Sequence, residues 1–107
     1  MDSNYSFNEY QNDAMSFRME SATALYAVLQ VAAEAGEVAG KYAKAIRDGA
    51  PPTFQQDIKK ELGDVLWGLA AVALDNGFTL EDVARGNISK LSARKENGTL
   101  QGSGDNR

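Results

Sequence analysis

Four carboxylates in two short motifs are the residues of this chain best suited to chemistry. Glu34 and Glu37 stand three positions apart in the sequence EAGE, and Glu61 and Asp64 repeat that spacing in ELGD. On a helix, residues at i and i+3 lie about 60° apart around the axis and one turn apart along it, so each motif presents two acids on one edge. Four carboxylates on two facing helices repel one another unless a cation lies among them. An all-oxygen ligand set of this kind suits Mg²⁺ or Mn²⁺.

The second motif lies within a strongly apolar segment. From position 61 to 74 the chain reads ELGDVLWGLAAVAL, in which only Glu61 and Asp64 ionise. A helix that is apolar almost all round is normally buried, and buried carboxylates are usually paired or bound to metal. A single ExxE motif is more often a solvated stripe that forms salt bridges with lysines. Two such motifs, one of them inside an apolar helix, favour a metal site instead.

Composition limits the class of protein. A chain of 107 residues, 43% of them hydrophobic, is sufficient for one folded domain. No apolar run approaches the roughly 20 residues of a membrane span and no signal peptide opens the chain, so we expect a cytoplasmic protein with no membrane partner. The net charge of −4 disfavours a nucleic-acid partner. Without cysteine or histidine, the chain has no thiol nucleophile, imidazole base or Glu-x-x-His pair of the di-iron bundles.

The elements that must position the acids are helices. Apolar periodicity predicts an all-α fold with four helices, over about residues 6–19, 24–47, 53–75 and 79–95. One side of the expected second helix is apolar and carries Leu25, Leu29, Ala32, Ala39 and Ile46. Its opposite edge is polar and carries Gln30, Glu34, Glu37, Lys41 and Lys44.

Local signals place the helix ends. Gly49 followed by two prolines ends the second helix, as a C-terminal glycine and a following proline commonly do. The segments 53–56 and 79–82 each begin with threonine and have a glutamine or an acid three positions on, which predicts capping boxes for the third and fourth helices. Residues 1–97 are expected to form one domain. The segment 98–107 is rich in glycine, serine and asparagine and predicts a flexible C-terminal tail.

The apolar third helix also predicts self-association. Three amphipathic neighbours in so short a chain cannot easily cover a helix that is apolar nearly all round, and a twofold dimer is the simplest remedy. Glycines and alanines along the second and third helices would let helices approach closely, although they could serve only the packing within one chain.

The order of these motifs resembles that of a known family, the MazG-like all-α nucleoside triphosphate pyrophosphohydrolases. The family pattern is ExxE, a spacer of one to three dozen residues, and ExxD. Flanking sequences agree as well: Glu9-Tyr10-Gln11 precedes the first motif, and Asn87 to Arg94 is close to the family's Asn-x-x-Lys-Leu-x-x-Arg ending. The resemblance covers about residues 7–98.

This resemblance implies a fold and an activity. The fold would be a four-helix MazG-like bundle completed by homodimerisation, or by a dimer of dimers. The activity would be Mg²⁺-dependent hydrolysis of a (deoxy)nucleoside triphosphate to the monophosphate and pyrophosphate, through attack of a metal-activated water on the α-phosphorus. Mn²⁺ is a possible substitute for Mg²⁺. Glu34, Glu37, Glu61 and Asp64 would be both the catalytic residues and the metal ligands, and Glu34 or Glu37 could act as the general base.

The resemblance extends to substrate binding. On the fourth helix, Asn87, Lys90 and Arg94 form one polar flank and would face the metal site and bind the β- and γ-phosphates.

Candidate residues for a base pocket are Gln11, Met15 and Trp67, with ordinary packing as the alternative role. Several family members have an aromatic residue four positions after the last acid, where this chain has Gly68. Base preference therefore does not carry over from the family.

Two other functions compete with this interpretation. A non-enzymatic helical interaction protein would account for the apolar third helix and the small size, but not for acids at matched spacing in two helices. A metal-dependent hydrolase of another phosphate ester would use the same carboxylates.

Overall fold

A computed structural model describes residues 4–105, which contain four α-helices and no strand. The helices are α1 (Phe7–Ser16), α2 (Ala24–Asp48), α3 (Phe54–Asp75) and α4 (Leu80–Glu96). The expected all-α class and the four helices are confirmed, and the largest error in a boundary is at the end of α1, which stops at Ser16 rather than near position 19. The first three residues of the expected domain and the last two of the expected tail lie outside the described range.

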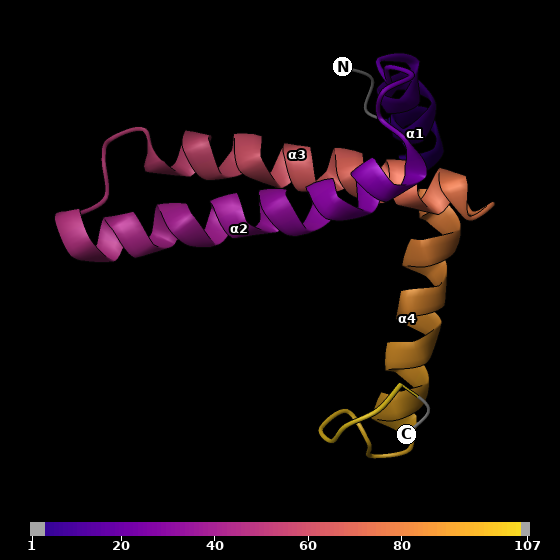
Figure 1. Ribbon diagram of the computed structural model, residues 1–107. Helices are drawn as coiled ribbons and strands as arrows, with labels where there is room; N and C mark the ends of the chain where they lie inside the picture. The colour runs from indigo at the N-terminus through magenta and orange to yellow at the C-terminus, as the bar shows by residue number, and fades with distance from the viewer. Residues whose placement is uncertain (1–3, 106–107) are drawn as a thin grey trace.

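The helices form an open, angular arrangement (Figure 1). The long helices α2 and α3 run side by side in opposite directions and make the most extensive helix contact. At one end of this pair, α1 packs on α3 and α4, while α4 runs away from the pair in a different direction. No contact joins α2 to α4 within the described residues.

The two expected capping boxes have different outcomes. At α4 the box is confirmed, because the Thr79 hydroxyl accepts from the backbone N–H of Asp82 and the Asp82 carboxylate accepts from the Thr79 N–H. At α3 it is wrong. Thr53 has φ −90° and ψ 5°, which is not the extended conformation that an N-cap side chain needs, and its hydroxyl instead donates to the Asp57 carboxylate at 3.0 Å.

A buried amide joins three helices at the corner of the molecule. The Gln11 side chain on α1 donates to the carbonyl oxygens of Ala70 (3.1 Å) and Phe78 (3.3 Å) and accepts from the backbone N–H of Leu80 (3.0 Å). Only 6% of Gln11 is exposed. The amide thus satisfies backbone groups at the α3–α4 turn and holds α1 against it.

A second polar link ties the α1–α2 connection to the end of α3. The Arg18 guanidinium donates through both terminal nitrogens to the two carboxylate oxygens of Asp75, each at 2.9 Å, and through Nε to the Ala22 carbonyl at 2.8 Å. Both ionic side chains are largely covered, and the hydrogen bonds from Arg18 lower the pKa of Asp75. This fork-shaped pairing is stronger than an exposed ion pair.

Asp75→Asn is expected to lower the free energy of unfolding at pH 7 by about 1–3 kcal/mol, because charge-assisted hydrogen bonds are lost from a mostly covered arginine. Since the folded state lowers the pKa of Asp75, its contribution is present above the pKa of the unfolded state and is lost as pH falls through the lower folded value. Denaturant titrations of both proteins should therefore differ at pH 7 and converge as the pH falls through the lowered pKa of Asp75 in the folded state. Asp48→Asn, which breaks the exposed pair with Arg47, is the matched control and should change stability less.

The single chain buries little. The buried hydrophobic residues are alanines and one leucine, and no large side chain is fully enclosed among the described residues. The accessible surface is 7914 Å², whereas a compact monomer of this mass exposes about 5,800 Å². The radius of gyration is 16.6 Å, against about 13 Å for a compact domain of this length. The chain is therefore much more open than an ordinary small monomer.

The exposed apolar surface includes one whole side of α2. Leu25 (68%), Leu29 (60%) and Ile46 (86%) are exposed, and so are Ala32 and Ala39 on the same side. This is the side that sequence periodicity identified as apolar. It does not face α3, because α2 meets α3 through Ala27, Val31 and their neighbours. On α3 itself, Leu62, Leu69 and Leu74 are about half exposed, so the expected burial of that helix is incomplete within one chain.

Two further features complete the fold. None of the described helices has the length and apolarity required to cross a membrane. After α4, residues 98–105 form turns that bring Asp105 back onto Lys90 and Arg94.

Candidate active site

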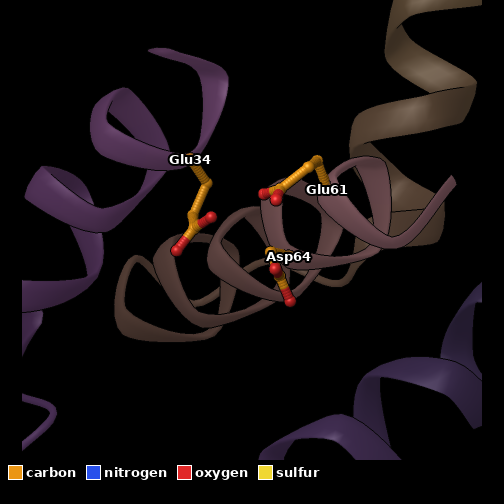
Figure 2. Close-up of side chains that lie close together, drawn as sticks. All are labelled: Glu34, Glu61 and Asp64. Atoms are coloured by element: carbon orange, nitrogen blue, oxygen red, sulfur yellow. The ribbon is translucent and has the colours of Figure 1, made fainter. Parts of the chain in front are cut away.

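Three of the four motif acids converge between α2 and α3. Glu34 from α2 and Glu61 and Asp64 from α3 each offer a carboxylate oxygen, and these oxygens all lie within 4.8 Å of one another. Figure 2 shows the Glu34 and Glu61 carboxylates directed toward the same space, with Asp64 beside them. Oxygen atoms at these separations can share one divalent cation of the Mg²⁺ type. We call this set the acidic trio.

Close packing of the two helices brings the trio together. Gly68 lies one turn beyond Asp64 on α3, and a Cβ at this position would stand 2.9 Å from a methyl carbon of Val31. The side chain that a larger residue would add has no room there, so glycine lets α3 approach α2.

The electrostatics of the trio favour a cation. Partial burial raises the pKa of Glu34 above its usual value, and the neighbouring charges of Asp64 and Glu61 raise it further. A divalent ion would remove this repulsion. Lys41, two turns along α2, places its ammonium 4.0 Å from a carboxylate oxygen of Glu61, which offsets only part of the charge.

Glu37 lies outside the trio. It follows Glu34 by one turn of α2, is exposed, and is close enough for its charge to contribute to the raised pKa of Glu34. The geometry therefore brings together three of the four predicted ligands, and ligation by Glu37 stays a prediction.

A pocket of about 650 Å³ adjoins the trio and shares Asp64 with it. Its walls come from α1, the α1–α2 connection, α2 and α3, and its aromatic lining residues are Tyr10, Phe17, Tyr26 and Trp67. The indole N–H of Trp67 donates to the Ala14 carbonyl at 2.9 Å, which fixes the orientation of the ring. Burial and the charge of Asp64 raise the pKa of Tyr10. This combination can hold a flat apolar group next to bound phosphates.

The three residues expected at a base pocket occupy different places. Trp67 lines the pocket. The Gln11 side chain forms hydrogen bonds with the backbone at the α3–α4 turn. Met15 packs against the small core of Ala70, Ala73 and Leu80. These contacts are those of ordinary packing, and a role for Gln11 and Met15 in a base pocket stays a prediction.

Within one chain, the polar flank of α4 does not face the trio. It lies on the helix that has no contact with α2, and it contacts the tail instead. The Lys90 ammonium is 3.2 Å from an Asp105 carboxylate oxygen, and Arg94 donates to the same oxygen and to two tail carbonyls. Arg94 is 6% exposed, and its buried Nε has no partner among the described residues. Lys90 and Arg94 thus hold an anionic group, while Asn87 remains exposed beside them.

Sequence reasoning did not assign two residues that the structure places at the site. Lys41 lies beside Glu61, and Gln30 lines the pocket one turn before Glu34. Both belong to the polar edge of α2 that carries the acids, so the signal was present in the helical periodicity. The periodicity alone could not show that this edge runs along the α2–α3 contact.

The structure thus combines three acids on two antiparallel helices, a donor set that could hold a divalent cation, with an aromatic pocket beside them. A family model of the MazG nucleotide pyrophosphohydrolase domain matches residues 14–99, and the chain belongs to this family. It is therefore a hydrolase of the nucleotide pyrophosphohydrolase type, from a family that is typically metal-dependent.

The chain is also similar to a phage protein over most of its length. The chain is 41% identical over 85 residues to the Gene 37 protein of Mycobacterium phage L5, in an alignment that covers 77% of this chain and 75% of the relative. No solved structure matches the chain.

Proposed function

We propose that the protein hydrolyses (deoxy)nucleoside triphosphates to the monophosphate and pyrophosphate, with Mg²⁺ at the acidic trio and water attacking the α-phosphorus. The observation that carries this proposal is the convergence of Glu34, Glu61 and Asp64 within 4.8 Å, next to a pocket lined by aromatic residues. The family assignment supports nucleotide pyrophosphohydrolysis, and the triphosphate substrate and the metal are the proposed refinements.

The donor set fits the proposed metal. Three carboxylates from two helices supply hard oxygen ligands, and partial burial together with the charges of Asp64 and Glu61 raises the pKa of Glu34. Magnesium, or manganese in its place, supplies charge neutralisation of the phosphates and a more acidic water. Glu34, Glu61 and Asp64 hold the ion, and Glu37 is proposed as a further ligand.

The protein's own side chains must accept the proton of the attacking water and bind the phosphates. A carboxylate must orient the attacking water and take its proton, and Glu34 and Glu37 are the candidates on α2. Glu37 lies one turn from the trio and is exposed, which leaves its carboxylate accessible to the water. Lys41 is placed to exchange its contact with Glu61 for a phosphate oxygen, because an ammonium binds phosphate as a point charge.

We also propose that the functional unit is a homodimer or a dimer of dimers. The chain exposes roughly 2,100 Å² more surface than a compact monomer of its mass, which is the scale that stable interfaces bury. The uncovered apolar side of α2 supplies a continuous face for a second copy. Since α4 does not reach the trio of its own chain, binding of β- and γ-phosphates by Asn87, Lys90 and Arg94 requires a site completed between subunits.

Product analysis tests the activity. The purified protein is incubated with each ribo- and deoxyribonucleoside triphosphate and Mg²⁺, and the products are separated by ion-exchange chromatography. Monophosphate and pyrophosphate in equal amounts support the proposal. Orthophosphate and diphosphate would point to another phosphate-ester hydrolase, and no turnover of any nucleotide would favour the interaction protein.

A further inference from the structure

We infer that the C-terminal tail competes with phosphate for the polar flank of α4. The Asp105 carboxylate occupies the position between Lys90 and Arg94, and a phosphate group must displace it to bind there. The inference rests on the proposed function only for the identity of the displacing anion, the β- or γ-phosphate of a triphosphate. The tail acts in this way as a built-in inhibitor.

Two cations hold one oxygen atom of the tail. The Lys90 ammonium lies 3.2 Å and the Arg94 guanidinium 3.4 Å from the same carboxylate oxygen of Asp105. The Arg94 nitrogen Nη2 also donates to the carbonyl oxygens of Gly104 (3.3 Å) and Asp105 (3.0 Å). An ammonium beside a guanidinium is a donor set that binds phosphate oxygens. Asp105 therefore fills a site whose chemistry suits a phosphate.

The carboxylate that fills this site is ionised at neutral pH. An ordinary aspartate already carries its charge at pH 7. The hydrogen bond and charge of Lys90, followed by those of Arg94, lower the pKa of Asp105 further. An incoming phosphate therefore meets an anion in place and not an empty pair of cations.

The sequence after α4 specifies how the tail leaves the helix. Gly98 has φ 69°, in the left-handed region, and its N–H donates to the Lys95 carbonyl. The N–H of Thr99 donates to the Arg94 carbonyl at 2.7 Å. These two bonds form the Schellman motif, which ends a helix at a left-handed glycine. The start of the tail is therefore a defined turn, from which the chain returns to α4.

The two sides of the contact differ in how easily they separate. The Arg94 side chain is 8% exposed and belongs to α4, whereas the Asp105 side chain is 84% exposed. Exposed ion pairs contribute little to stability, so the tail can leave while the cations stay in place. Asp105 is tethered 11 residues from Arg94, and a free ligand therefore competes with an effective tail concentration on the order of millimolar. A polyphosphate, with several charges, can replace the single carboxylate.

The test measures binding of inorganic tripolyphosphate in EDTA, so that neither a metal nor hydrolysis of a nucleotide contributes. Asp105→Asn keeps the shape of the side chain and removes its charge. Isothermal titration calorimetry should give Asp105→Asn a dissociation constant at least about threefold lower than that of the parent, since two exposed ion pairs no longer oppose the ligand. Glu96→Gln removes the same charge from the exposed end of α4 and is the matched control, which should bind as the parent does.

A double-mutant cycle shows whether the effect comes from the contact itself. Lys90→Met removes one of the two cations at a partly exposed position, and circular dichroism checks that the helices are kept. In this background Asp105→Asn should improve binding less than it does in the parent, because part of the competing contact is already lost. Equal improvement in both backgrounds would mean that Asp105 acts only through net charge, which would contradict the inference.

A second measurement follows the tail directly. Heteronuclear NOE values of the backbone amides over residues 100–105 report motion on the picosecond to nanosecond timescale. Saturating tripolyphosphate should lower these values, because the tail leaves α4. Unchanged values at saturation would show that tail and phosphate bind together, and would overturn the inference.

The outcomes separate this inference from the proposed function. No binding of tripolyphosphate, or equal dissociation constants for Asp105→Asn and the parent, would overturn the inference even if triphosphates are hydrolysed. Tighter binding by Asp105→Asn that depends on Lys90 supports the competition even if no triphosphate is turned over.

Discussion

Glu61→Gln should lose nearly all turnover, by roughly three orders of magnitude in kcat, while its helical content and oligomeric state remain those of the parent. Glu61 lies in the trio, and its carboxylate is within reach of both Glu34 and Lys41. The amide keeps the shape of the side chain but removes one negative charge from the cation site. Steady-state kinetics with Mg²⁺ and the best triphosphate measure the effect.

A matched control shows whether the loss of activity comes from the position of Glu61 or from the loss of any one negative charge. Glu96→Gln makes the same chemical change at the exposed end of α4, where the carboxylate has no ion pair in the described structure. It should leave kcat and KM unchanged. Full activity of Glu61→Gln, or full activity of the parent protein in EDTA, would show that the trio is not the metal centre.

Leu29→Asp should separate the subunits. Leu29 is 60% exposed in the single chain and lies on the uncovered apolar side of α2. If a second copy covers this side, the new carboxylate is buried without a partner, and we expect the association constant to fall at least about a hundredfold, or about 2.7 kcal/mol. Light scattering coupled to size-exclusion chromatography measures the mass. The parent should elute well above 11.5 kDa and melt at a temperature that rises with protein concentration.

Gln101→Asp adds the same charge to the exposed tail and should keep the mass of the parent. A parent protein that is monomeric at micromolar concentration would contradict the dimer proposal. So would a Leu29→Asp protein that keeps the oligomeric mass and concentration-dependent melting of the parent.

Sequence patterns were sufficient for the helices and for most of the acidic site. Periodicity and end signals predicted α2, α3 and α4 closely because each has a glycine, proline or threonine near its boundaries. No such residue follows α1, and the end of α1 is where the predicted boundary differs most. The matched spacing within the two motifs, Glu34 to Glu37 and Glu61 to Asp64, was informative because residues one turn apart share an edge whatever the tertiary structure. Thr53 failed as a capping residue because its backbone conformation depends on the two preceding prolines and on Asp57, which a four-residue pattern does not describe.

The remaining features depend on how the helices pack. The buried Gln11 amide hydrogen-bonds to the backbone on both sides of the α3–α4 turn, where α4 changes direction. In the sequence, Gln11 is one polar residue in the expected first helix, and nothing indicates that it binds this turn. For the same reason the flank of Lys90 and Arg94 could not be placed relative to the trio. The sequence pattern identified the apolar side of α2 correctly. It could not show that this side is uncovered, because α2 meets α3 through a different side, where Val31 packs against Gly68.

The most direct test of the central claim is the position of oxygen from water in the products. Hydrolysis of the preferred triphosphate is carried out in ¹⁸O-enriched water with Mg²⁺, and the products are examined by mass spectrometry or by the isotope shift of their ³¹P resonances. Attack at the α-phosphorus, with the trio holding the metal, predicts one ¹⁸O in the nucleoside monophosphate and none in the pyrophosphate. Label in pyrophosphate, or release of orthophosphate that carries the label, would contradict the proposed reaction.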